Sequence, residues 1–146
     1  MHIKPRIVVD SNVFVSGVIS PAGIPGAILA AWRRDRVTLL IAPLLLAEYG
    51  EVLRRPALRA RHHKSDAALS DLFMEVLTSA QAVTPLSPLP LASRDPDDDV
   101  LLAIALGGGA HYLVTSDDDL LSLRDHEALG SLRIVTPQEL IALLSA

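Results

Sequence analysis

The stretch RIVVDSN at residues 6–12 decides the fold, because a β-branched run that ends in an aspartate is typical of a buried parallel strand. We expect Arg6–Val9 to form that strand, with Asp10 at its carboxyl end. Further apolar runs follow at 37–42, 81–86, 112–115 and 133–136. Segments of helical composition separate these runs, so the chain predicts a Rossmann-like, three-layer α/β/α sandwich with a parallel sheet of four to five strands.

The segments between the strands carry helix signals. Apolar spacing predicts helices over 27–34, 43–55, 66–80, 97–106 and 137–144. Ser65 is the expected cap of the third of these, and Pro56 is expected to end the second. Residues 16–26 hold three glycines and two prolines and are interpreted as a turn-rich connection.

Length and composition limit the class of protein. The chain has 146 residues, of which 50% are hydrophobic and 21% charged, which predicts a single domain over 1–146 and excludes disorder. It contains no cysteine, so disulfides and thiolate metal sites are excluded and any metal must be held by oxygen or imidazole. The sequence contains no apolar stretch of the roughly 18 residues that a membrane span needs and no signal-peptide core, so we expect a cytoplasmic protein without membrane association.

Charge is unevenly distributed along the chain. Removing seven clustered aspartates would change the formal charge from −4 to +3, and residues 33–64 carry a local net charge of +5. This segregation is compatible with an acidic metal pocket beside a basic surface for a polyanion, or with a solvated arginine-rich helix end. The seven acids are Asp95, Asp97, Asp98, Asp99, Asp117, Asp118 and Asp119.

Four acids are predicted to meet at one edge of the sheet. Asp10 and Asp117 follow predicted strands, Asp99 begins the helix before the fourth strand, and Glu48 lies on the helix after the second. Four close carboxylates raise one another's pKa unless a cation compensates them. Oxygen ligands favour Mg²⁺ or Mn²⁺, and such a site can activate water for hydrolysis of a phosphodiester.

Four motifs resemble those of the PIN-domain ribonucleases, and in particular the prokaryotic PIN proteins regarded as toxin components of toxin–antitoxin systems. The motifs are IVVDSNVFVSG (7–17), PLLLAEYGEVLRRP (43–56), RDPDDDVLLAIALGGGAHYLVTSDDDLL (94–121) and RIVTPQEL (133–140). The resemblance implies a PIN-like α/β/α fold, Mg²⁺- or Mn²⁺-dependent cleavage of RNA, homodimerisation or a higher homo-oligomer, and neutralisation by a small protein antitoxin.

The resemblance also implies catalytic and metal-binding roles for Asp10, Glu48, Asp99 and Asp117. The acidic runs leave the register open, so Asp98 is an alternative to Asp99, and Asp118 is an alternative to Asp117. Asp119 matches a further acid that in some family members assists a second ion.

Other polar residues are candidates to contact the substrate. Asn12 matches the polar residue two positions after the first aspartate, although it is equally suited to cap the following turn. The hydroxyl groups of Thr115 and Ser116 are suited to position a phosphate or a water molecule. The arginines suited to contact RNA phosphates, a partner chain or only water are Arg54, Arg55, Arg59 and Arg61.

An alternative hypothesis keeps the fold and discards the catalysis. In this interpretation the acids cap helices or bind a structural ion, and the chain is a PIN-like binding or scaffold module. A phosphatase is disfavoured, because residues 10–12 read Asp-Ser-Asn and lack the second aspartate of the DxD signature.

Overall fold

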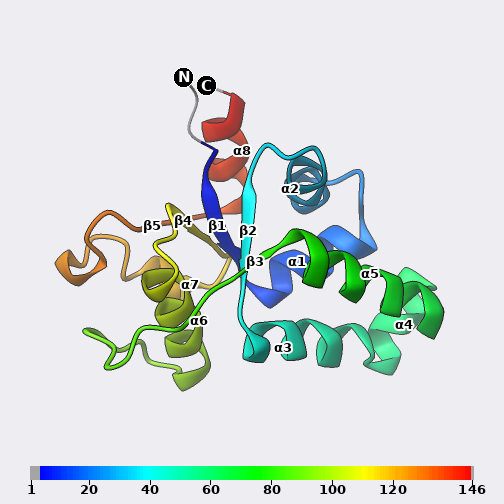
Figure 1. Cartoon of the computed structure of the whole chain (residues 1–146), viewed down its shortest axis with the longest axis horizontal. Coiled ribbons are helices and arrows are strands. Elements are labelled where there is room, and N and C mark those ends of the chain that lie inside the picture. Colours follow the sequence, from blue (N-terminus) through cyan, green and yellow to red (C-terminus); the bar gives the residue numbers. More distant parts are fainter. Residues whose placement is uncertain (1–3, 146) are drawn as a thin grey trace.

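The computed structural model describes residues 4–145, and its centre is a five-stranded parallel sheet (Figure 1). The strand order is β3-β2-β1-β4-β5, and every neighbouring pair is parallel. The strands are β1 (Arg6–Val9), β2 (Thr38–Ile41), β3 (Gln81–Ala82), β4 (Tyr112–Val114) and β5 (Arg133–Val135). The predicted α/β class and the five parallel strands are therefore confirmed, although β3 is much shorter than the apolar run at 81–86.

Helices connect the strands and cover both faces of the sheet. The chain turns from β1 outward to β2 and β3, then returns past β1 to β4 and β5. Right-handed crossovers place the helices of the first two connections on one face and α6 and α7 on the other, as Figure 1 shows. The helices are α1 (Ser11–Ile19), α2 (Ile24–Arg33), α3 (Pro43–Leu53), α4 (Pro56–His62), α5 (Asp66–Ser79), α6 (Pro96–Gly107), α7 (Asp118–Leu121) and α8 (Pro137–Ser145), with a 3₁₀ turn at Glu127–Leu129.

Two helices differ from the sequence-based expectation. The turn-rich connection expected over 16–26 is largely helical, because α1 extends to Ile19 and α2 begins at Ile24. Gly17 does not break α1; it lets α2 approach, since a Cβ there would lie 2.8 Å from the Leu29 side chain. Pro56 ends α3 as expected but also opens α4, because proline suits the first turn of a helix.

The first connection is also the most apolar part of the helical layer. Helices α1 and α2 are bent by 92° with respect to each other. Within residues 4–145 no single helix is long and apolar enough to cross a membrane, although this bent pair passes the criterion of length and composition when taken together.

The core consists almost entirely of aliphatic side chains. Ile7, Val8 and Val9 of β1 are fully buried, as are Leu113 and Val114 of β4. Polar groups are rare in this interior, because burying one without a partner is costly. The buried polar or charged residues of the described chain lie after β1, after β4 or in the first turn of α6: Asp10, Ser11, Asp98 and Thr115.

Candidate metal centre

The ends of β1 and β4 form the floor of the candidate site. These strands are neighbours at the point where the strand order reverses, which is where ligands bind in open α/β sheets. Val9 pairs with Val114, so Asp10 and Thr115 leave the sheet side by side. The Thr115 hydroxyl donates to Asp10 Oδ2 at 2.7 Å and accepts the Asp117 N–H at 3.0 Å. The buried hydroxyl of Thr115 thus holds Asp10, which follows β1, and Asp117, which follows β4.

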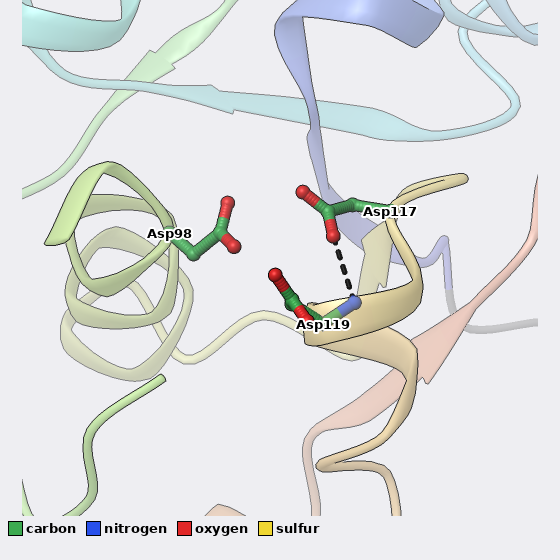
Figure 2. Close-up of side chains that lie close together, drawn as sticks. All are labelled: Asp98, Asp117 and Asp119. Carbon is green, nitrogen blue, oxygen red and sulfur yellow. Dashed lines mark hydrogen bonds between the residues drawn. The ribbon is translucent and has the colours of Figure 1, made fainter. Parts of the chain in front are cut away.

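Three aspartates form an acidic cluster above this floor. Oxygen atoms of Asp98, Asp117 and Asp119 lie within 4.8 Å of one another, and we call these three residues the acidic cluster. Asp117 also caps α7, since its Oδ1 accepts the Asp119 N–H at 2.8 Å. Figure 2 shows the Asp98 carboxylate extending from α6 toward Asp117 and Asp119. The cluster therefore joins α6 to the turn after β4.

Asp98 is the most unusual member of the acidic cluster. The residue is 5% exposed, and its Oδ2 atom is buried without a hydrogen-bond partner. Burial raises the pKa of Asp98 to about 7, and the surrounding carboxylates add to this effect. Those carboxylates belong to Asp117, Asp95, Asp10 and Asp119.

Asp10 belongs to the same electrostatic group. Burial raises its pKa above the ordinary value, the Thr115 hydrogen bond opposes that rise, and the negative charges of Glu48 and Asp117 add to it. An ionised carboxylate that is both desolvated and surrounded by like charges is unfavourable. A divalent cation would remove this conflict and give the free Asp98 oxygen a partner, so the residues fit a hard metal ion.

The neighbouring residues Asp98 and Asp99 point in different directions. Successive residues on a helix are rotated by about 100°, so only one of the two can face the cluster. Asp99 Oδ1 accepts the Ser93 N–H at 2.7 Å and fastens the connector before α6. The structure brings Asp98 to the cluster and not Asp99, so the alternative register is the one that the geometry favours. Asp118 is exposed and lies outside the cluster, whereas Asp117 lies within it.

Glu48 approaches from α3 on the solvent side. Its side chain is exposed and is not part of the acidic cluster, but its charge acts on Asp10. It lines a cleft of about 280 Å³ between α3 and α6, together with Glu51 and Asp97. Glu48 is thus placed beside the predicted metal site, next to Asp10.

The remaining predicted residues lie farther out. Asn12 and Ser116 are exposed near the ends of β1 and β4. The four arginines are on or beside α3 and α4, away from α6 and α7 in Figure 1. Arg55 pairs with Glu51 and Arg59 with Asp66, while Arg54 lies over the Phe73 ring; Arg61 is exposed.

Sequence reasoning overlooked the polar role of Tyr49. Its side chain is fully buried. Its hydroxyl, however, donates to the Val9 carbonyl, directly before Asp10. Burial, Asp10 and Glu48 raise the pKa of Tyr49 well above its ordinary value, so the hydroxyl keeps its proton. No signal in the sequence indicates this bond, because it depends on where β1 and β2 separate.

Comparison with known proteins agrees with this fold. The family model described as PIN domain matches residues 6–119. An uncharacterized protein, MJ1680, of Methanocaldococcus jannaschii is 31% identical over 144 residues, which are 95% of this chain and 91% of that protein. The crystal structure of PAE2754 from Pyrobaculum aerophilum superposes with a TM-score of 0.56 at 21% identity, covering 97% of this chain and 90% of that one, and shows the same fold.

Proposed function

Because this chain belongs to the PIN-domain family, whose members are typically metal-dependent nucleases, we propose that it is an endoribonuclease that uses Mg²⁺ or Mn²⁺. The observation that carries the proposal is the buried, unpartnered Asp98 oxygen facing two further aspartates. A cluster of carboxylates that includes an unsatisfied oxygen is suited to a hard cation. Asp98, Asp117 and Asp119 would hold the ion, with Asp10 and Glu48 adjacent.

The chain's own residues would prepare the site for hydrolysis. When bound, the ion supplies Lewis-acid activation of water and neutralises charge on the scissile phosphate. Thr115 holds Asp10 in place through Oδ2, and Asp117 is held by its cap on α7. Asp98, whose pKa is raised to about 7, would hold the cation in its deprotonated form. Glu48, on the exposed side next to Asp10, would add a further carboxylate to the surroundings of the ion.

Neighbouring aspartates offer a matched test. We expect D98N and D117N to abolish cleavage of a single-stranded RNA in Mg²⁺ or Mn²⁺, because each removes an oxygen of the acidic cluster. D99N and D118N alter adjacent acids outside the cluster and should retain cleavage. Circular dichroism would establish that all four variants fold. Cleavage by folded D98N at the wild-type rate, or metal binding without any cleavage by the wild type, would contradict the proposal, the latter favouring a scaffold module.

We further propose that the chain is the toxin of a cytoplasmic toxin–antitoxin pair that forms homodimers and is neutralised by a small protein antitoxin. The support is the resemblance of its four motifs to such toxins. Expression of the wild type should arrest growth, and D98N should not. Sequencing the ends of cellular RNA after expression would identify the cleaved sites, and sedimentation would report the oligomer. Normal growth at high wild-type expression would contradict the toxin assignment.

A further inference from the structure

We propose that Tyr49 is a positioning residue that holds Glu48 beside Asp10. The inference rests on the proposed metal-dependent function. Tyr49 directly follows Glu48 on α3, and its hydroxyl donates to the carbonyl of Val9, which directly precedes Asp10. A single hydrogen bond therefore joins the residues next to two acids that come from different elements.

The Val9 carbonyl needs this partner because of where the strands separate. The Asp10 N–H bonds to Val114 of β4, so the alternation of backbone groups directs the Val9 carbonyl to the opposite side, toward β2. The register between β1 and β2 ends at Ile7, which pairs with Leu39. Beyond that point the buried carbonyl has no ladder partner on this side, and the Tyr49 hydroxyl satisfies it.

The ring of Tyr49 makes a second contact on the other side of Asp10. It stacks on Phe14 with centroids 4.1 Å apart and planes 4° from parallel. The Phe14 N–H in turn donates to the Asp10 carbonyl at 3.0 Å, in the first turn of α1. Tyr49 thus touches the backbone before Asp10 with its hydroxyl and the helix after Asp10 with its ring.

Glu48 depends on this anchor more than the other acids do. Asp10 is held by Thr115, and Asp117 is held by its bond to the Asp119 N–H. Glu48 is exposed, and no side-chain cap fixes the start of α3. Its position is therefore set by the buried face of α3, on which Tyr49 is the nearest residue with a polar link to β1.

The test removes the hydroxyl while keeping the ring. Loss of a group that orients a metal ligand typically lowers metal affinity by about 10–100-fold. Y49F should therefore bind Mn²⁺ at least about tenfold more weakly than the wild type in titration calorimetry. V52A, which shortens a buried side chain of the same helix face one turn later, is the control and should bind Mn²⁺ like the wild type. Equal Mn²⁺ affinity of Y49F and the wild type would overturn the proposal.

A double-mutant cycle separates positioning from general loosening of the fold. If Tyr49 acts through Glu48, Y49F should weaken Mn²⁺ binding in the wild-type background and have no further effect in E48Q. Additive losses would show that Tyr49 supports the site in some other way and would overturn the proposal. The cycle uses folded protein and metal alone, so it does not depend on which RNA is cleaved.

A metal-free measurement keeps this inference distinct from the proposed function. If the wild type binds no Mn²⁺, the nuclease proposal fails, and amide hydrogen exchange then decides the role of Tyr49. Faster exchange in Y49F confined to 43–50 and to the end of β1 would support the anchor. Unchanged exchange in these segments, or an equal increase over the whole chain, would overturn it.

Discussion

At the scale of single residues, Thr115 has the most exacting role. Its hydroxyl donates to Asp10, which lies 105 positions away in the sequence, and accepts the Asp117 N–H. Both hydrogen bonds lie where two strands end, beside the few polar residues that are buried in the described chain. A buried hydroxyl that serves as donor and acceptor at once fixes the direction of both partners.

Replacing Thr115 with valine should destabilise the protein. T115V keeps the shape but leaves the Asp10 carboxylate and the Asp117 N–H without their partner, which typically costs about 1–3 kcal/mol. The free energy of unfolding from urea titration would measure the loss. T115S retains the hydroxyl and should lie much closer to the wild type; equal losses in the two variants would show that the methyl group, not the hydroxyl, matters.

Asp98 should make the metal-free protein less stable as the pH rises. In the folded state its pKa is raised to about 7, whereas its ordinary value is 3.8. Between these values the folded chain holds a proton that the unfolded chain has released, so stability is lost as the pH rises through the folded pKa. Above about pH 7 the loss of folding stability that Asp98 causes has reached its full size.

Thermal unfolding in EDTA from about pH 5 to about pH 8 would measure this effect. D98N should flatten the decrease in melting temperature, and D118N should leave it as in the wild type. Added Mg²⁺ should restore stability at the upper end of the range by neutralising the carboxylates. An identical pH profile for D98N and the wild type would show that another group titrates.

At the scale of elements, the strands were predictable and some helices were not. Buried parallel strands read as short apolar runs, and all five of those runs became strands. The helix α1 was hidden because Gly17 usually weakens a helix, whereas here it is the contact point for α2. The four-residue α7 was too short for apolar periodicity to reveal it.

The close approach at Gly17 can be tested directly. A Cβ there would lie 2.8 Å from both the Leu29 Cδ1 atom and the Pro25 carbonyl oxygen. Because backbone cannot move aside easily, G17A should destabilise the protein by about 1–3 kcal/mol despite alanine's higher helix propensity. S16A, at an exposed position of the same helix, is the control. A G17A variant as stable as the wild type would mean that α1 and α2 can separate without cost.

The candidate site was only partly predictable from the sequence. The topology placed Asp10 and Asp117 at adjoining strand ends, and composition alone indicated oxygen ligands. The choice between Asp98 and Asp99 depends on the rotation of α6 about its axis, to which a run of three aspartates gives no clue. Tyr49 was beyond prediction in detail, since its bond to Val9 depends on where β1 and β2 diverge.

At the scale of the whole molecule, acidic and basic groups occupy different regions. The acidic cluster lies beside α6 and α7, while the arginines of 54–61 lie at the far end of α3 and on α4. Arginine groups that neutralise phosphates release counterions, so affinity for RNA should fall as salt rises. The basic region would then contribute to binding, and the acidic region to cleavage.

Arg61 offers the test of this division. It is exposed, and none of the ion pairs found within residues 4–145 includes it. R61Q should weaken binding of a single-stranded RNA and reduce the slope of log affinity against log salt by up to about one. R124Q, which alters an arginine paired with Glu139 on another part of the surface, is the control. Fluorescence anisotropy at several salt concentrations would measure the RNA affinity of both variants. Identical slopes for R61Q and the wild type would exclude Arg61 from the RNA contact.

The strand order has a consequence for how the protein is made. Asp10 is translated more than a hundred residues before β4 and Thr115, which lie beside it in the fold. A nascent chain that has been translated only as far as α6 therefore contains Asp98 of the acidic cluster but not Asp117 or Asp119. Under the proposed function, the ability to cleave RNA would therefore arise only after the turn that follows β4 has been translated.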